Sequence, residues 1–213
     1  MNTNDAIKTD MLAYVNEKYE ATFVADTLIK ANWAYHYDKL YVYPEGEAEN
    51  KFEIHRYQDE AGNISYADGY FGILIKNDYD RVVSDIVQAA IGEATVYTSL
   101  DQEIYANRLK PETKLSGIYH PDEIFSSQSF VFTTPSQLGS DQFSDEQLRV
   151  LGQKLADEKL VCFLTLYVIS DDNYANLDEA TFKNNLIKLN PSDRRMVEID
   201  YSLAVAIKGS GTI

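Results

Sequence analysis

The amino-acid sequence predicts an α+β fold, with antiparallel or mixed sheets covered by helices. Its 213 residues have a globular composition, with 45% hydrophobic and 25% charged side chains. β-branched and aromatic residues, which favour strands, are plentiful. Segments that alternate between apolar and polar residues are interspersed with segments of helical period. We therefore expect a single α+β domain over residues 1–213, or two similar α+β halves that meet near residues 101–117.

The first part of the chain combines one helix with a series of strands. A helix is expected at Asp5–Tyr19, because Ile7, Met11 and Val15 recur on one face at helical spacing. Gly69 and Gly72 indicate a bend or bulge after the last strand of the series. The strands, with a hairpin turn at 59–63, are expected at Thr22–Lys30, Tyr35–Tyr43, Lys51–Gln58 and Ile64–Tyr70. Such an antiparallel run argues against a purely parallel sheet.

A second helix is expected to start near Asn77 and to end at Gly92. Apolar residues between these two positions form a continuous stripe, and a glycine is a common helix stop. A strand at Thr95–Thr98 follows directly. Residues 101–117 contain a proline and a glycine, which predict irregular structure or a short helix there.

The last part of the chain contains the clearest helix start. Ser144 and Gln147 have the spacing of a capping box, which predicts a helix to about Glu158. The apolar run Leu160–Ile169 predicts a strand at the centre of a sheet. The other expected elements are a strand at Gln128–Thr133, a loop at Pro135–Gln142, a helix from Asn176 or Asp178 to Asn190, and a strand at Met196–Ile207. The order helix, turn, strand thus occurs twice, as in ordinary α+β layering or after an old duplication.

The charge of the chain excludes two classes of partner. The net charge is −15, from 19 basic and 34 acidic residues. Nucleic acids and anionic membrane surfaces are both bound through clustered Lys and Arg, so neither is expected as a partner. The charge favours a soluble protein, or one that meets a basic partner. No apolar run approaches the ~18 residues of a membrane-spanning helix, so no integral membrane segment is expected.

The sequence contains no motif for a cofactor or a metal. Cys162 is the single cysteine and stands in an apolar run, so we expect a buried structural cysteine. A disulfide within the chain and a zinc site of several thiolates are excluded. Gly69 and Gly72 fit neither a dinucleotide-binding motif nor a P-loop. Residues 171–175 lack the ligand spacing of a calcium loop.

The three histidines are His36, His55 and His120. None has the spacing of a metal-binding pair, and no nucleophile motif accompanies them. His55 is expected on the solvent-facing side of a strand, with Glu53 and Tyr57. A hydrolase with dispersed catalytic residues, such as His36 or His120, stays open as an alternative.

The candidate binding surface is the densest aromatic segment of the chain. Tryptophan and tyrosine combine a broad apolar face with a polar tip, which suits ligand pockets and protein interfaces. An alternative is that some of these tyrosines cover one face of a sheet while the others pack against the first helix. The candidate residues are Trp33, Tyr35, His36, Tyr37, Tyr41 and Tyr43.

The segments Leu12–Tyr19, Tyr41–Pro44 and Asp68–Gly72 resemble a group of uncharacterised proteins from Gram-positive, often gut-associated, bacteria. Members of that group are frequently secreted lipoproteins. The likeness covers about residues 1–95 and includes no catalytic residue. It implies a bacterial setting but no activity. The chain as written departs from the lipoprotein pattern, because it has neither a signal peptide nor a lipidated cysteine.

The favoured function is a non-catalytic binding or accessory protein of a bacterium, with an unknown protein or glycan as its ligand. One alternative is an acidic inhibitor or immunity-type protein that binds a basic partner; the other is the hydrolase. The expected location is the cytoplasm for the sequence as written, or outside it if a signal or lipobox precedes this sequence.

Overall fold

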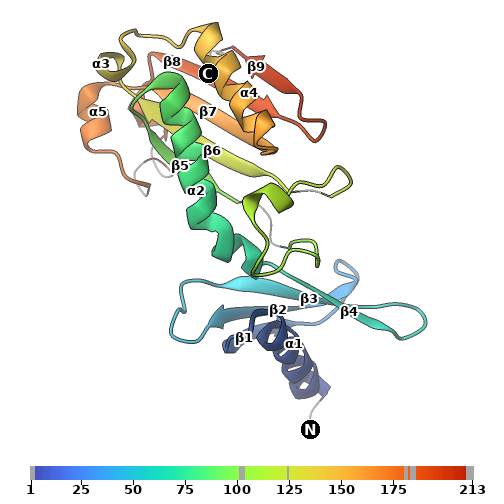
Figure 1. Cartoon of the computed structure of the whole chain (residues 1–213). Coiled ribbons are helices and arrows are strands. Elements are labelled where there is room, and N and C mark those ends of the chain that lie inside the picture. Colours follow the sequence, from blue (N-terminus) through green and yellow to red (C-terminus); the bar gives the residue numbers. More distant parts are fainter. Residues whose placement is uncertain (1–2, 101–103, 124, 180–181, 183–185, 210–213) are drawn as a thin grey trace. The chain divides into compact units, whose positions relative to one another are not determined.

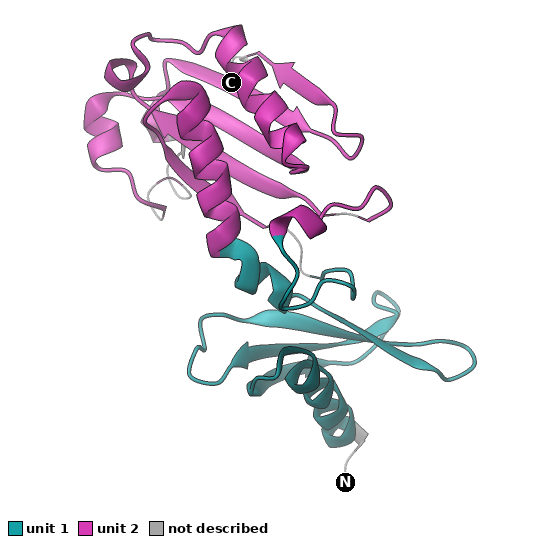
Figure 2. Cartoon of the chain, viewed as in Figure 1, with its two compact units in different colours: residues 1–76, 102–114 teal, residues 77–101, 115–213 magenta. Residues whose placement is uncertain are grey.

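The computed structural model describes residues 3–100, 104–123, 125–179, 182 and 186–209. Helices and two sheets, one of four strands and one of five, confirm the α+β class (Figure 1). The chain divides into two compact units (Figure 2). Unit 1 comprises residues 1–76 with 102–114, and unit 2 comprises residues 77–101 with 115–213.

Unit 1 is an antiparallel four-stranded sheet with one helix packed on it (Figure 1). The helix is α1 (Thr3–Tyr19), as predicted. Its apolar stripe meets the even-numbered residues of the two central strands, such as Leu40 and Ile54, which are fully buried. The strands, in sheet order, are β1 (Phe23–Ile29), β2 (Tyr37–Pro44), β3 (Phe52–Gln58) and β4 (Ile64–Asp68).

The strand register assigns each side chain to one face of this sheet. Leu40 pairs with Ile54 and Val42 with Phe52, all on the face that α1 covers. The odd-numbered residues of β2 and β3 point to the opposite face, here called the outer face. The pairing of β1 with β2 is interrupted by an irregularity between Ala25 and Leu28.

Helix α2 (Tyr70–Ile91) starts seven residues before the expected position near Asn77. The predicted bend is confirmed at Gly69, directly after β4, but is wrong at Gly72, which lies inside the first helical turns. A Cβ atom at Gly72 would lie 2.2 Å from the hydroxyl of Tyr105, so a larger residue there would require Tyr105 to move. Asp68 accepts a hydrogen bond from the amide of Tyr70 at 3.1 Å and so satisfies one free donor of the helix start.

Unit 2 contains a mixed five-stranded sheet in the order β5-β6-β7-β8-β9. Strand β7 lies in the middle, as its apolar sequence predicts. It runs parallel to β6 and antiparallel to β8. The parallel pair requires a crossover, and α4 (Asp145–Asp157), which packs on β8 and β9, lies within it. The strands are β5 (Thr95–Ser99), β6 (Ser127–Thr133), β7 (Cys162–Val168), β8 (Asp193–Ile199) and β9 (Val205–Lys208).

Two sequence predictions in unit 2 are corrected. The expected loop at 135–142 begins with the short helix α3 (Pro135–Leu138), which is capped by Thr134. The expected single strand at 196–207 is a hairpin of β8 and β9. Asp200 forms its turn, because its side chain accepts hydrogen bonds from the amides of Ser202 at 2.8 Å and Ala204 at 3.0 Å.

The region between β7 and β8 starts its helical structure earlier than expected. Helix α5 (Asp171–Ala175) begins after the cap Ser170. The helix predicted from Asn176 or Asp178 falls partly on residues outside the described chain, and a 3-10 turn, η2 (Leu186–Leu189), lies near its expected end. The irregular segment at 101–117 contains the 3-10 turn η1 (Leu115–Gly117) in its described part.

Candidate functional site

The candidate aromatic residues occupy one loop and one strand of unit 1. Trp33, Tyr35 and His36 lie in the loop of residues 30–36 between β1 and β2, here called the aromatic loop. Tyr37, Tyr41 and Tyr43 lie on β2 and point to the outer face, so none of the three packs against α1. The loop and the β3–β4 turn lie at the same end of the sheet (Figure 1).

Trp33 is 93% exposed, which is unusual for the largest apolar side chain in proteins. Tyr35 and Tyr57 are 44% and 37% exposed at the same end of the sheet. None of the three belongs to the buried core of unit 1. All three lie at the same end of the sheet, where they are a candidate for an interaction surface.

The aromatic loop is held by hydrogen bonds within itself and to β2. The side-chain oxygen of Asn32 accepts from the amide of Ala34 at 2.8 Å. The amide of Asn32 donates to the carbonyl of Tyr35 at 2.9 Å. The amide of Ala31 donates to Asp38 Oδ1 at 2.9 Å. These bonds fix the turn that presents Trp33.

A charged cluster of Lys39, Glu53 and His55 lies on the outer face. Lys39 Nζ is 2.8 Å from one carboxylate oxygen of Glu53 and 2.9 Å from the other. His55 Nε2 donates to the same carboxylate at 2.8 Å. Burial alone raises the pKa of Glu53, but hydrogen bonds from Lys39, His55 and Tyr41 reverse this, and its pKa is lowered overall. These three donors thus hold Glu53 as a carboxylate.

Tyrosine rings cover this outer-face cluster. Tyr37 stacks on the imidazole of His55 with ring centroids 4.0 Å apart. Lys39 Nζ lies 5.4 Å from the ring centre of Tyr35 and 5.6 Å from that of Tyr41, within the range of cation–π attraction. The hydrogen bond to Glu53 raises the pKa of Tyr41. The rings cover the three polar side chains, which are buried although they lie on the face away from α1.

The prediction that His55 faces solvent is therefore wrong. His55 is 5% exposed and Glu53 is 7% exposed. The alternation of the strand places both on the outer face, as expected, but the tyrosines of β2 exclude water there.

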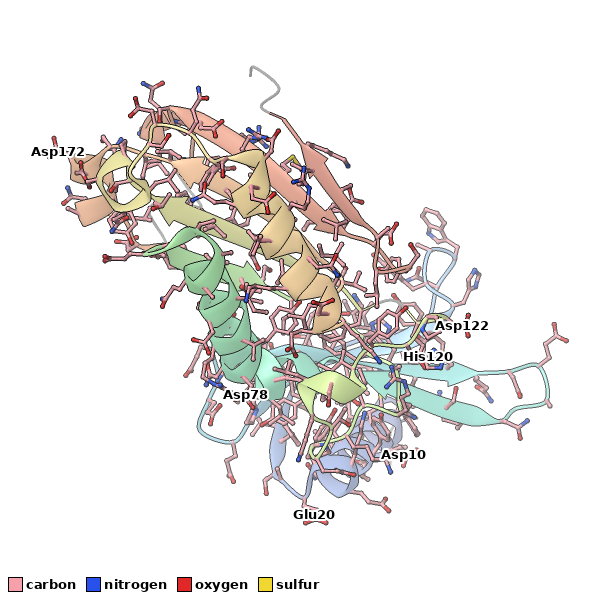
Figure 3. All side chains as sticks on the ribbon, turned by 45° about the horizontal axis from the view of Figure 1, so that its top comes forward. Asp10, Glu20, Asp78, His120, Asp122 and Asp172 are labelled. Atoms are coloured by element: carbon pink, nitrogen blue, oxygen red, sulfur yellow. The ribbon has the colours of Figure 1, made fainter. Side chains whose placement is uncertain are left out.

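A polar groove lies beside α1 and is lined in part by the aromatic loop. It encloses about 890 Å³, including space open to solvent, and Ala6, Ile7, Ala31 and Tyr37 contribute apolar surface to its lining. Asp38 pairs with Lys30 at 2.9 Å and with Arg56 at 3.0 Å. Asp10, on α1 (Figure 3), is exposed at the edge of the groove. Its polar groups come from Asp10, Lys30, His36, Asp38, Arg56 and Gln58.

A second buried network, around Asp68, has no signal in the sequence. Asp68 is fully buried and pairs with Lys18 at 2.7 Å. The hydroxyls of Tyr14 and Tyr19 donate to it at 2.8 and 2.6 Å. Burial and the charge of Asp68 raise the pKa of both tyrosines. Because all three of these donors come from α1 and Asp68 is the last residue of β4, the network links the helix to the end of this strand.

His120 lies in unit 2, next to Asp122 (Figure 3). It lines a small pocket of about 280 Å³, partly open to solvent, together with Glu123 and Lys159. His120 and His36 are both exposed. Among the described residues, neither histidine is paired with a carboxylate. Cys162 is fully buried in β7, and burial raises the pKa of its thiol to about 12, so it is unsuited to nucleophilic attack.

Within the described part of the chain, no group of three or more His, Cys, Asp or Glu side chains is arranged to hold a metal ion. In the same residues, no helix is long and apolar enough to span a membrane.

Comparisons with known proteins give one distant structural neighbour. No family model and no curated protein matches the chain. A search of solved structures finds the crystal structure of a DUF5037 family protein from Ruminococcus gnavus. It is 10% identical, with a TM-score of 0.46 and 92% of each chain covered. The neighbour comes from a gut bacterium, but no comparison of sequences supports the family resemblance or the lipoprotein setting expected from residues 1–95. A likeness of this degree carries no argument about activity or ligand.

Proposed function

We propose that this protein is a non-catalytic binding protein whose ligand contacts the aromatic loop and the adjoining end of the four-stranded sheet. The observation that carries the proposal is the 93% exposure of Trp33. An indole left in water forgoes a large gain from burial, and the core of unit 1 makes no use of it. Such a side chain is typical of a binding hot spot that is covered only when the ligand is present.

The order of the loop supports the same proposal. Binding with a mobile loop loses affinity, because the loop must be ordered each time. Here Asn32 closes the turn, and Asp38 holds Ala31, before any ligand arrives. Tyr35 is also restrained, by its contact with Tyr37 at 5.7 Å between ring centres. The surface is thus organised in advance for contact.

The histidines favour binding over hydrolysis. A general base needs a histidine held by a partner and open to substrate. His55 is held by Glu53 but is buried under Tyr37. His36 and His120 are open but have no carboxylate partner in the described residues. No described histidine combines both properties.

The test compares Trp33→Ala with a matched control on glycan and peptide arrays. Tyr201→Ala is the control, because Tyr201 is similarly large and 38% exposed but lies in unit 2. We expect Trp33→Ala to abolish or strongly weaken every bound spot while thermal unfolding stays unchanged, and Tyr201→Ala to bind as the wild type does. Binding that survives Trp33→Ala would reject this surface. Binding that is lost when salt is added but is unchanged in Trp33→Ala would favour the alternative, in which the negative net charge attracts a basic partner.

A further inference from the structure

We infer that the ligand of this surface is a neutral carbohydrate chain, with one sugar ring stacked on Trp33 and neighbouring hydroxyl groups bound in the polar groove beside α1. The inference rests on the proposed function and names the chemical class of its ligand. It combines two features of one short loop: exposed aromatic rings and a groove of paired polar side chains that the loop helps to line.

The charge of the groove argues against an ionic ligand. Its two cations, Lys30 and Arg56, face two anions, Asp10 and Asp38. Asp38 already pairs with both cations through contacts of 2.9 and 3.0 Å, and together with Asp10 it balances their charge. An anionic ligand would have to compete with Asp38, and a cationic ligand would have to compete with Lys30 and Arg56. A neutral ligand leaves these pairs intact.

The same side chains suit hydroxyl groups. A sugar hydroxyl is both a donor and an acceptor, and it needs partners of both kinds. Asp10 supplies acceptors, Lys30 supplies donors, and the amide of Gln58 supplies both. The groove therefore offers planar, oriented groups of both kinds to an uncharged polar molecule.

The aromatic loop supplies the apolar part of sugar recognition. One face of a pyranose ring carries C–H groups, and these stack on flat aromatic rings. Trp33 offers such a face, and Tyr35 offers a second at the same end of the sheet. A stable protein interface needs about 800 Å² from each partner with an apolar centre, which is more than three exposed rings provide.

The single tryptophan gives a direct measurement. Trp33 is the only tryptophan, so selective excitation reports this one site in the intact chain. Three sets of probes are titrated: neutral oligomers of glucose, xylose and N-acetylglucosamine; anionic oligomers of galacturonate; and a peptide library. We expect neutral oligomers to change the emission and to protect Trp33 from quenching by acrylamide. Affinity measured by calorimetry should fall at least about tenfold in Trp33→Ala and about two- to tenfold in Gln58→Ala.

The outcomes separate the two proposals. Loss of neutral-sugar binding in Trp33→Ala and a smaller loss in Gln58→Ala, with Tyr201→Ala unchanged, supports the carbohydrate class. Binding of only the anionic oligomers or the peptides, still dependent on Trp33, overturns the carbohydrate class and leaves the proposed function standing. Binding that is unchanged in Trp33→Ala, or a lack of binding to any probe set, overturns both the proposed binding surface and the carbohydrate class.

Discussion

At the scale of single residues, the main feature of unit 1 is a buried charge cluster beneath tyrosine rings. Lys39 and Glu53 are 9% and 7% exposed, so each depends on the other for compensation of its charge. A buried pair adds little to stability when compared with apolar residues, but removing one member leaves an uncompensated charge. The cluster therefore makes the outer face sensitive to substitution.

Replacing Lys39 by Met is expected to lower the free energy of unfolding by about 3 kcal/mol, because Glu53 loses its cationic partner. Lys51→Met is the control. Lys51 pairs with Asp26 on the surface, with side-chain exposures of 48% and 37%, so a much smaller loss of stability is expected. Urea unfolding followed by circular dichroism measures both. Equal losses in the two variants would contradict the role given to the buried pair.

The stability of unit 1 should also depend on pH through Glu53. Its pKa is lowered in the folded protein. A lowered folded pKa means that the carboxylate adds stability above its unfolded pKa of about 4.3, and that this stability is lost as pH falls through the folded value. Urea midpoints measured from neutral to acidic pH should therefore fall less steeply in Glu53→Gln than in the wild type. Parallel curves would show that Glu53 does not contribute to the acid sensitivity.

At the scale of elements, close contacts at two glycines shape the packing of α2 and α4. Tyr105 packs its ring edge-on against Phe71 and its hydroxyl against the backbone of Gly72. Gly152 in α4 is similar, because a Cβ atom there would lie 2.3 Å from Val205 Cγ1. Two helical glycines therefore permit close packing, although glycine weakens an isolated helix.

Gly72→Ala is expected to destabilise the protein. Helix propensity alone predicts that the free energy of unfolding rises by roughly 0.5–1 kcal/mol in this variant. The sign of the measured change therefore shows whether the close contact outweighs helix propensity. The added methyl group must displace the buried Tyr105. In the double variant Gly72→Ala/Tyr105→Ala, the loss in the free energy of unfolding should be smaller than the sum of the two single-variant losses. This is expected for residues in direct contact. A stability gain in Gly72→Ala alone would show that Tyr105 moves aside freely.

Local patterns predicted the elements that depend on local chemistry. The stripe of α1, the capping box of α4 and the apolar run of β7 all form where expected. The start of α2 was missed because Gly72 resembles a helix breaker, whereas it lies in the helix and packs closely against Tyr105, which is far along the chain. The turn between β8 and β9 was missed because it has no glycine or proline; Leu203 takes a left-handed backbone with φ of 61°.

The candidate site was predictable only as a list of residue types. The aromatic segment was found from its composition, and the exposure of Trp33 agrees with an interaction surface. The groove was not predictable, because Arg56 and Asp10 join it from different elements. The burial of His55 depends on rings from a neighbouring strand, which a single-strand pattern does not contain.

At the scale of the whole molecule, each unit has its own hydrophobic core. Leu40 belongs to the core of unit 1 and Leu164 to the sheet of unit 2, and both are fully buried. Helix α2 begins in unit 1 and continues in unit 2. We propose that the units open separately, since each buries its own apolar face.

Leu40→Ala and Leu164→Ala form a matched pair for this proposal. Each should cost about 2–5 kcal/mol through the cavity it leaves. Hydrogen exchange should speed up mainly in β1 to β4 for the first variant and mainly in β5 to β9 for the second. Acceleration across both sheets in either variant would mean that the chain opens as one cooperative body.

The irregularity in β1 has a consequence for behaviour at high concentration. β1 is an edge strand, and an unpaired edge is a template for adding a strand from another copy. The break in register between Ala25 and Leu28 places exposed Asp26 in this edge. A broken and charged edge does not present the continuous row of donors and acceptors that a second sheet would need. The protein is therefore protected at β1 against growth into sheet-extended fibrils.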